Sequence, residues 1–135
     1  MPSPKKILPP SSPEAERRLA YFTGRRDQLI STIRDLVEIE SPSDNKAAVD
    51  CVSAAVAQKF AALGGALKVH PAKDFGNHLQ VDFAGKSAGK PVLLLGHYDT
   101  VYDLGTLKTM PWREQDGKLA GPGVFDMKSG SGAGD

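Results

Sequence analysis

The amino-acid sequence predicts an α/β fold in which helices flank a mixed sheet, and three observations predict it. Helical periodicity fills most of residues 13–63. Two short segments with strand-like patterning follow, at 66–70 and 77–83. A continuous apolar run then occupies 91–96, which is typical of a strand covered on both faces. Helices that lead into such a strand indicate a layered α/β arrangement.

The helical part begins with an element whose start is marked by capping residues. It is expected to begin near Ser12 and Pro13, and Ser11 and Glu14 are spaced as a capping box. Gly24 is expected to break or kink it. Beyond this break the apolar positions that recur at helical spacing are Leu29, Ile33, Leu36 and Val37.

A second helix follows a proline stop. Ser41-Pro42 ends the first element. The next helix is expected to start around Ser43 or Asp44 and to stop at Gly64-Gly65. Its apolar stripe consists of Val49, Val52, Val56, Phe60 and Leu63.

The segments around the apolar run are predicted as turns and loops. Residues 84–90 form a polar turn. Residues 102–120 form a long loop that ends in a turn at Asp116-Gly117 and a short strand. The sequence therefore divides into a flexible Pro-rich lead-in, one domain and a Gly- and Ser-rich tail, at residues 1–12, 13–128 and 129–135.

Composition narrows the class of protein. With 135 residues the chain suits one domain, and its 17 Lys plus Arg nearly balance its 16 Asp plus Glu. Because no strong field results, neither nucleic acid nor an anionic membrane is expected as a partner. No apolar run is long enough for a signal peptide or a membrane span, so we expect a cytoplasmic protein.

Two candidate metal-site residues lie at the end of the apolar run. His97 directly follows the predicted strand, at the sheet edge where open α/β folds place ligands. Asp99 is two residues further on, so both side chains point the same way if the backbone stays extended. A carboxylate behind the ring accepts one ring N–H and strengthens the other nitrogen as a ligand. A histidine that merely caps its own backbone is the simpler explanation of an isolated His-x-Asp pair.

Asp126 is the third candidate. It follows a Gly-Pro-Gly turn and the apolar pair Val124-Phe125, and is expected at the end of a short strand. A carboxylate suits the bridging of two cations, because each oxygen binds a different ion. Taken by itself, Asp126 is explained more simply as an exposed loop aspartate. The other histidines, His70 and His78, lie on predicted strands and are expected to be ordinary surface or edge residues.

Together these motifs form a specific pattern. The strings GHYDTV at 96–101 and DGKLAGPGVFDMKSG at 116–130 resemble the M20 family of zinc-dependent metallopeptidases and amidohydrolases, most closely its glutamate carboxypeptidase branch. Upstream, ISTIRDLVEIESPS at 30–43 and GNHLQVDFAG at 76–85 resemble the N-terminal half-domain of the family. The resemblance covers roughly residues 25–130.

The resemblance implies a fold, a metal site and an activity. The domain would be the N-terminal part of a zinc-peptidase-type catalytic domain. His97 would bind one zinc ion, Asp126 would bridge two, and Asp99 would stand behind His97 and orient it. Met127 would follow the bridging aspartate, where the family often has a strained peptide bond. Zinc is the implied metal, with cobalt as an alternative. The implied activity is metal-assisted hydrolysis of an amide bond in a small peptide or N-acyl amino acid.

Ligand counting predicts that this site is incomplete. Two tetrahedral ions need about eight bonds, of which water supplies one or two. His97 gives one bond and a bridging Asp126 gives two. The family's Glu-Glu pair, later acidic ligand, distal histidine and dimerisation region have no counterpart before Asp135. The chain is therefore expected to be a truncated N-terminal segment that carries the first half of the site, binds zinc weakly and is inactive alone.

Three alternatives stay open. The complete protein could be a deacetylase or desuccinylase of N-acyl amino acids, because the residues that select the substrate lie largely outside this sequence. The chain could instead be a non-catalytic fragment that serves at most as an interaction module. Finally, a separate chain could supply the missing ligands and form a split enzyme.

Overall fold

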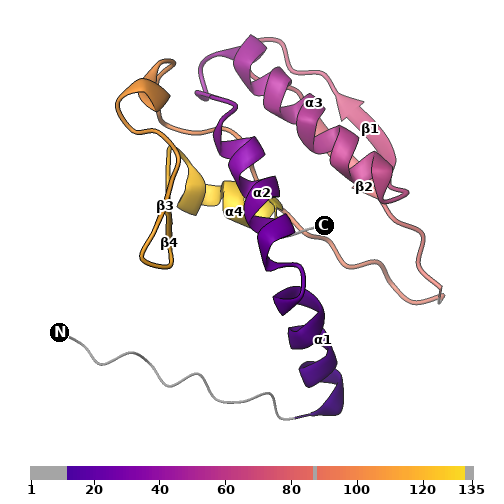
Figure 1. Ribbon diagram of the computed structural model, residues 1–135. Coiled ribbons are helices and arrows are strands. Elements are labelled where there is room, and N and C mark those ends of the chain that lie inside the picture. The colour runs from indigo at the N-terminus through magenta and orange to yellow at the C-terminus, as the bar shows by residue number, and fades with distance from the viewer. Residues whose placement is uncertain (1–11, 87, 133–135) are drawn as a thin grey trace.

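Three helices form the first half of the part that the structure describes, a computed structural model covering residues 12–86 and 88–132. They are α1 (Pro13–Thr23), α2 (Arg26–Val37) and α3 (Lys46–Ala62). In Figure 1, α2 lies at the centre, α3 packs above it, and α1 extends away from the rest of the fold. The prediction of two helical elements with a break near Gly24 is therefore confirmed, the break being the junction between α1 and α2.

The cap of α1 lies at Ser12. The Ser12 side chain accepts a hydrogen bond from the backbone N–H of Ala15, and Pro13 occupies the first helical position. Ser11, the predicted partner in a capping box, lies outside the described residues. None of the side chains of α1 is buried. This helix is held by its cap and by local pairs such as Glu14 with Arg18, not by a core face.

The core lies between α2 and α3. Leu36 from α2 and Val52 and Val56 from α3 are almost fully buried and form one cluster. Half-buried side chains pack around this cluster: Ile39, Ala55, Phe60, Leu79 and Tyr98. Most positions of the predicted stripes therefore line the core, whereas Leu63, just after α3, is 50% exposed.

Helix α3 begins later than predicted. Its cap is Asn45, whose side chain accepts from the backbone N–H of Ala48, so Ser43 and Asp44 lie before the helix. The Ser43 hydroxyl is bonded to residues of another segment and does not cap the helix. The predicted stop is confirmed, since Gly64 has φ +86, a conformation that glycine adopts without a side-chain penalty.

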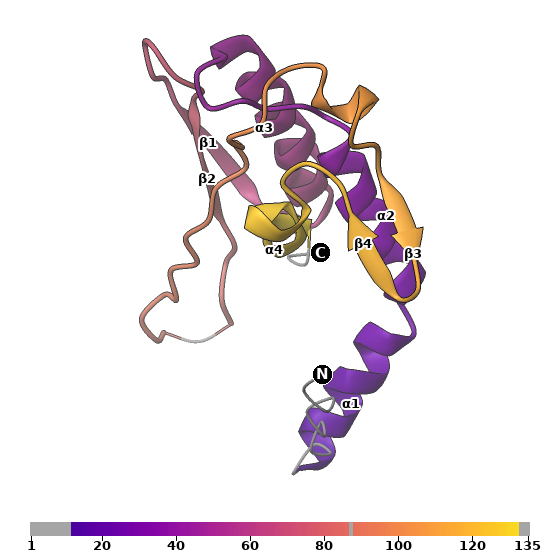
Figure 2. The ribbon, with the colours of Figure 1, turned by 90° about the vertical axis from the view of Figure 1, so that its left-hand side faces the viewer.

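The predicted pair of strands is confirmed as an antiparallel hairpin. Strand β1 (Ala66–His70) pairs with β2 (His78–Asp82), and His70 lies opposite His78. The hairpin contacts α3, and Figures 1 and 2 show it beside that helix. At Gly76, a Cβ atom would lie 2.1 Å from Cγ1 of Val49, so a glycine is required where the hairpin loop meets α3.

The apolar run at 91–96 differs from the prediction of a buried strand. It forms neither helix nor strand, and Val92, Leu93, Leu94 and Leu95 are 84–89% exposed. Figure 2 shows the chain leaving the body after β2 and returning to it through this segment. The apolar pattern indicates a segment suited to burial, but it does not specify which helices or strands would pack over it. Among the described residues, none packs over this segment.

The described residues therefore form two small antiparallel sheets in place of one mixed sheet. The second consists of β3 (Arg113–Gln115) and β4 (Lys118–Ala120). Asp116 and Gly117, which join them, have φ of +53 and +70, as a tight hairpin turn of this type requires. This turn and a short strand were predicted. The only parallel pairing in the described part is the isolated bridge between Pro42 and Thr100.

The last elements pack against α2. A short 3-10 helix, η1 (Thr106–Lys108), precedes β3, while η2 (Val124–Lys128) and α4 (Ser129–Gly132) follow β4. Both η2 and α4 contact α2. Residues 129–132, assigned from composition to a flexible tail, form a helical turn, while 133–135 lie outside the described residues. The observed architecture is a mixed α/β arrangement with small antiparallel sheets.

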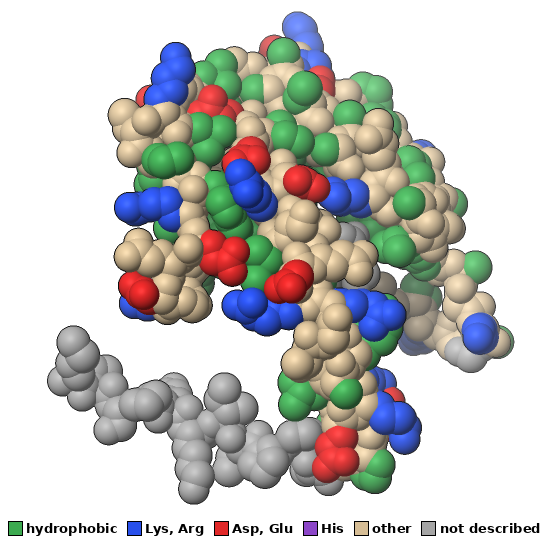
Figure 3. Space-filling model, in the orientation of Figure 1, with side chains coloured by type: hydrophobic (Ala, Val, Ile, Leu, Met, Phe, Trp, Pro, Cys, Tyr) green, Lys and Arg blue, Asp and Glu red, His purple; other side chains and the backbone are tan. Residues whose placement is uncertain are grey.

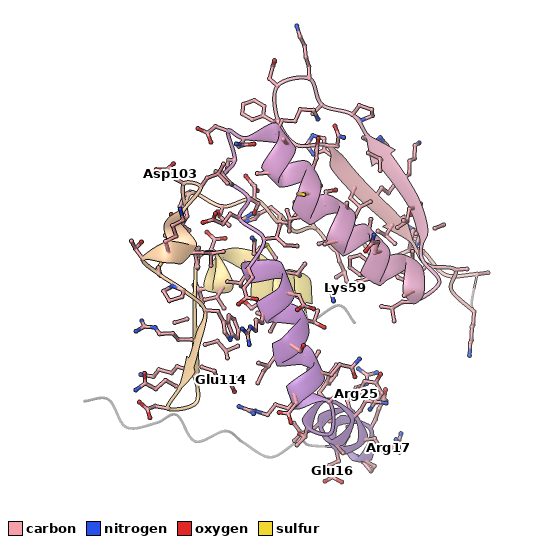
Figure 4. All side chains as sticks on the ribbon, turned by 45° about the horizontal axis from the view of Figure 1, so that its top comes forward. Glu16, Arg17, Arg25, Lys59, Asp103 and Glu114 are labelled. Atoms are coloured by element: carbon pink, nitrogen blue, oxygen red, sulfur yellow. The ribbon has the colours of Figure 1, made fainter. Side chains whose placement is uncertain are left out.

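Charged side chains are distributed over the surface. Figure 3 shows Lys, Arg, Asp and Glu intermixed on the visible face, as the near-zero net charge predicts. In Figure 4, Glu16, Arg17 and Arg25 lie at the α1 end of the molecule, and Asp103 lies at the opposite end near η1. Within the described part, no helix is both long and apolar enough to cross a membrane.

Candidate metal centre

The His97 ring lies between two carboxylates. Its Nε2 atom is 2.9 Å from Oδ1 of Asp126, and its Nδ1 atom is 3.2 Å from Oδ1 of Asp99. The side chains of His97 and Asp99 are partly exposed, and that of Asp126 is largely exposed. The structure thus brings together the three residues that the sequence singles out, with one carboxylate at each ring nitrogen.

Backbone pairing fixes the segment that carries Asp99. Residues 41–43 lie alongside 98–100, where the N–H of Thr100 donates to the carbonyl of Ser41 at 2.8 Å. The N–H of Ser43 donates to the carbonyl of Thr100 at 2.9 Å. The Ser41 hydroxyl donates to the carbonyl of Tyr98 at 2.8 Å. The connection between α2 and α3 therefore anchors the site segment across more than fifty residues of sequence.

Asp126 lies in a kinked turn, and the prediction that it ends a short strand is wrong. Gly123 precedes it with φ +75, and a Cβ atom there would lie 2.5 Å from Cγ2 of Thr100. Asp126 and Met127 have non-helical backbone angles inside η2, and the peptide bond between them is cis. The Gly-Pro-Gly signal predicts a turn correctly, but the apolar pair after it does not form a strand.

Met127 joins the segments that carry His97 and Asp126. Its sulfur accepts from the backbone N–H of His97 at 3.4 Å. A Cβ atom at Gly96 would lie 3.1 Å from Cε of Met127, so the side chain lies close against Gly96. The thioether therefore places the Asp126 turn beside the His97 backbone.

Sequence reasoning missed two charged residues, Lys128 and Glu40, that hold the segments around the site. Lys128 is almost fully buried, and its ammonium donates to the carbonyl of Ile39. Burial lowers the pKa of Lys128 to about 8, against the opposing attraction of Glu40. A lysine directly after an Asp-Met pair is ordinarily expected at the surface. No local pattern in the sequence signals its burial.

Glu40 holds the loop that faces Lys128. Its carboxylate accepts the backbone N–H groups of Gly105 and Leu107 at 2.9 Å. The bonds from Leu107 and Gly105 lower the pKa of Glu40 below its ordinary value. Glu40 thus stays ionised and ties the long loop to the end of α2.

The environment of His97 favours its protonated ring. Burial by itself would lower the pKa of His97. The hydrogen bond to Asp126, together with the hydrogen bond to Asp99 and the charges of both carboxylates, outweighs this and raises the pKa above 6.5. The two carboxylates therefore favour a positive charge on the ring.

The three residues border an open hollow. Its volume is about 300 Å³, and its lining also includes Ser43, Tyr102 and Phe125. By contrast, His70 lies on the hairpin, where its Nε2 is 2.9 Å from Oε1 of Gln80. Neither His70 nor His78 lines the hollow.

The geometry fits part of a metal site. In a tetrahedral zinc site with bonds of about 2.0–2.2 Å, two donor atoms lie roughly 3.3–3.5 Å apart. The 2.9 Å between His97 Nε2 and Asp126 Oδ1 approaches this separation. However, the described residues contain no group of three or more His, Cys, Asp and Glu side chains arranged to hold an ion. His97 and Asp126 are therefore a hydrogen-bonded pair, and Asp99 faces the opposite side of the ring.

Comparison with known proteins agrees with a distant relationship to peptidases. No family model matches the chain. Carboxypeptidase G2 from Pseudomonas sp. (strain RS-16) is 30% identical to it in an alignment of 112 residues that covers 81% of this chain and 26% of that protein. The chain thus spans about a quarter of the length of this relative. Over most of its own length, it is distantly similar to a carboxypeptidase.

Proposed function

We propose that this chain contributes part of the active site of a metal-dependent hydrolase that cleaves an amide bond in a small peptide or N-acyl amino acid. The observation that carries this proposal is the His97 ring, with Asp126 at Nε2 and Asp99 at Nδ1. The distant similarity to a carboxypeptidase supports it and favours release of a C-terminal amino acid. Membership of the M20 family is part of the proposal.

Each residue has a role in this proposal. His97 would hold zinc, or cobalt in its place, through Nε2. Asp126 would ligate the same ion and use its second oxygen for a second ion. Asp99 would accept the Nδ1–H bond and keep the Nε2 lone pair directed at the metal. When bound, zinc lowers the pKa of a water molecule and polarises the carbonyl that this water attacks.

The remaining groups come from outside the described residues. Asp99 and Asp126 are the carboxylates among the described residues that line the hollow. A general base and further ligands must therefore be added to them. The 26% coverage of the relative leaves ample sequence from which such groups could come in a complete protein. Tyr102 and Phe125 would offer apolar contact to the substrate.

Metal binding tests this proposal directly. We expect His97→Ala to weaken zinc or cobalt binding by about tenfold or more, because it removes a ligand. His78→Ala is the matched control, since His78 lies on β2 and does not line the hollow. Competition with a chromophoric chelator measures the affinities. Equal binding by wild type and His97→Ala would refute the metal site.

Activity is assayed on the product of the complete reading frame as well as on the chain. Peptides with a C-terminal glutamate, N-acetyl amino acids and N-succinyl amino acids separate the carboxypeptidase from the deacylase alternatives. A complete protein that binds metal and hydrolyses none of these amides would refute the proposed reaction. Location in the cytoplasm, and the absence of nucleic-acid and membrane partners, remain predictions from composition.

A further inference from the structure

The segment between α2 and α3 contributes the side chain of Ser43 to the lining of the hollow. The hydroxyl of Ser43 lies 2.6 Å from Oδ2 of Asp99 and 3.0 Å from the carbonyl oxygen of Thr100. The sequence position of Ser43, directly after Ser41-Pro42, suggests only a helix boundary. The structure instead directs its hydroxyl at the carboxylate behind His97.

We propose that Ser43 is a positioning residue, whose hydroxyl orients the Asp99 carboxylate so that Oδ1 faces Nδ1 of His97. This inference rests on the proposed function, because it assigns the group that aligns the proposed metal ligand. Ser43 acts through Asp99 and touches neither ring nitrogen.

The distances favour donation to the carboxylate. A serine hydroxyl has one proton to donate. Of its two neighbours, Asp99 Oδ2 is both the nearer, at 2.6 Å, and the charged one. Hydrogen bonds to an ionised acceptor are shorter and stronger than those to a neutral carbonyl. The proton therefore goes to Oδ2, and Oδ1 is left for His97.

A fixed carboxylate has a consequence for the ring. Asp99 is partly exposed, so without a second bond its carboxylate would rotate and exchange Oδ1 with water. The Ser43 bond holds one oxygen, and the other then remains 3.2 Å from Nδ1. The opposite ring nitrogen, Nε2, lies 2.9 Å from Oδ1 of Asp126, so a fixed Asp99 carboxylate also fixes the direction in which Nε2 faces Asp126.

The hydroxyl is separable from the backbone pairing. The N–H of Ser43 donates to the carbonyl of Thr100, and this bond survives replacement of the side chain by alanine. Ser43→Ala therefore removes only the hydroxyl contacts. Ser41→Ala is a matched control, because the Ser41 hydroxyl lies in the same paired segment but donates to the carbonyl of Tyr98.

The first experiment needs no metal. With ¹⁵N-labelled histidine at one fixed pH, multiple-bond spectra give the ¹⁵N shifts of both ring nitrogens of His97. We expect Ser43→Ala to shift the Nδ1 signal and leave the Nε2 signal in place. Ser43→Thr, which keeps the hydroxyl, should restore the wild-type spectrum, and Ser41→Ala should move neither signal selectively. An unchanged Nδ1 signal in Ser43→Ala, or equal shifts of both nitrogens, would overturn the inference.

The second experiment measures zinc and cobalt affinity in a double-mutant cycle. Direct partners of a metal-bound histidine contribute roughly 10–100-fold to affinity, so we expect Ser43→Ala, one step further away, to cost about three- to tenfold. In an Asp99→Ala background, the same change should cost nothing more. An additive loss would overturn the inference. If the Nδ1 shift appears but neither metal binds the wild-type chain or the complete protein, the positioning role stands and the proposed function fails.

Discussion

At the scale of single residues, two charged side chains, Glu40 and Lys128, hold the segments on either side of the site. Glu40 accepts two backbone N–H groups from the loop at 105–107, and the charges of Lys108 and of the buried Lys128 attract its carboxylate. Both groups are joined to the end of α2, since Lys128 donates to the carbonyl of Ile39. This pair therefore links the loop after Asp99 to the turn that holds Asp126.

Glu40→Gln should destabilise the fold in a pH-dependent manner. The folded-state pKa of Glu40 is below its ordinary value of 4.5. The carboxylate therefore contributes stability above pH 4.5, and this is lost as the pH falls through the folded pKa. We expect a loss of about 1 kcal/mol at pH 7, limited by solvent screening, and no difference between the proteins in strong acid. Urea unfolding across this pH range measures it, and a difference that persists in strong acid would contradict it.

The sequence predicts which residues form the site better than it predicts the long-range contacts that hold them. The His-x-Asp spacing predicts that Asp99 can stand beside His97, and the structure agrees at 3.2 Å. Nothing local predicts the roles of Ser43 or Glu40, because their partners lie more than fifty residues away along the chain. Local sequence patterns predict which secondary structure or burial suits a segment. They do not predict contacts between segments that are distant in sequence, because these depend on how the segments pack in the fold.

At the scale of elements, the Gly-Pro-Gly turn determines where Asp126 lies. Gly123 has φ +75 and abuts Thr100, the residue next to Asp99. The turn therefore sets the distance between the two acidic segments. Periodicity predicts α2, α3 and the hairpin of β1 and β2 correctly, since their hydrogen bonds are local. It fails at 91–96, where a strand needs a partner that the pattern does not specify.

Gly123→Ala should destabilise the fold and weaken metal binding together. Alanine at positive φ costs about 1 kcal/mol, and a Cβ atom 2.5 Å from Thr100 Cγ2 adds a further displacement. We expect a total loss of about 2–3 kcal/mol. Gly117→Ala is the control, because its φ is +70 but no atom lies within 4 Å of its Cβ. Equal losses in the two variants, measured by urea unfolding, would contradict the proposed contact.

At the scale of the whole molecule, the surface contains an unusual apolar segment. Val92, Leu93, Leu94 and Leu95 are 84–89% exposed, and Phe125 beside the hollow is 93% exposed. Contiguous exposed apolar surface of this kind promotes association. Backbone groups without a neighbouring strand offer a template for pairing as well.

Leu93→Lys with Leu95→Lys should reduce self-association of the chain. Both leucines are more than 80% exposed, so we expect little change in the stability of the fold. The control adds the same charge on the exposed face of α3, with Ala54→Lys and Gln58→Lys. Light scattering over a concentration series measures association. If both pairs of lysine substitutions reduced association equally, the cause would be the added net charge and not the loss of the apolar segment.

The bond from Lys128 to Ile39 closes a loop of 89 residues. Contacts of such long range lose the most chain entropy when they form, and they slow folding accordingly. The ring of His97 and the carboxylates of Asp99 and Asp126 lie within this loop. An ion that requires this assembled geometry would bind the folded chain alone and shift the unfolding equilibrium by mass action. A rise in the unfolding temperature on adding metal would then report the assembly of these distant segments, because no isolated helix or hairpin contains the site.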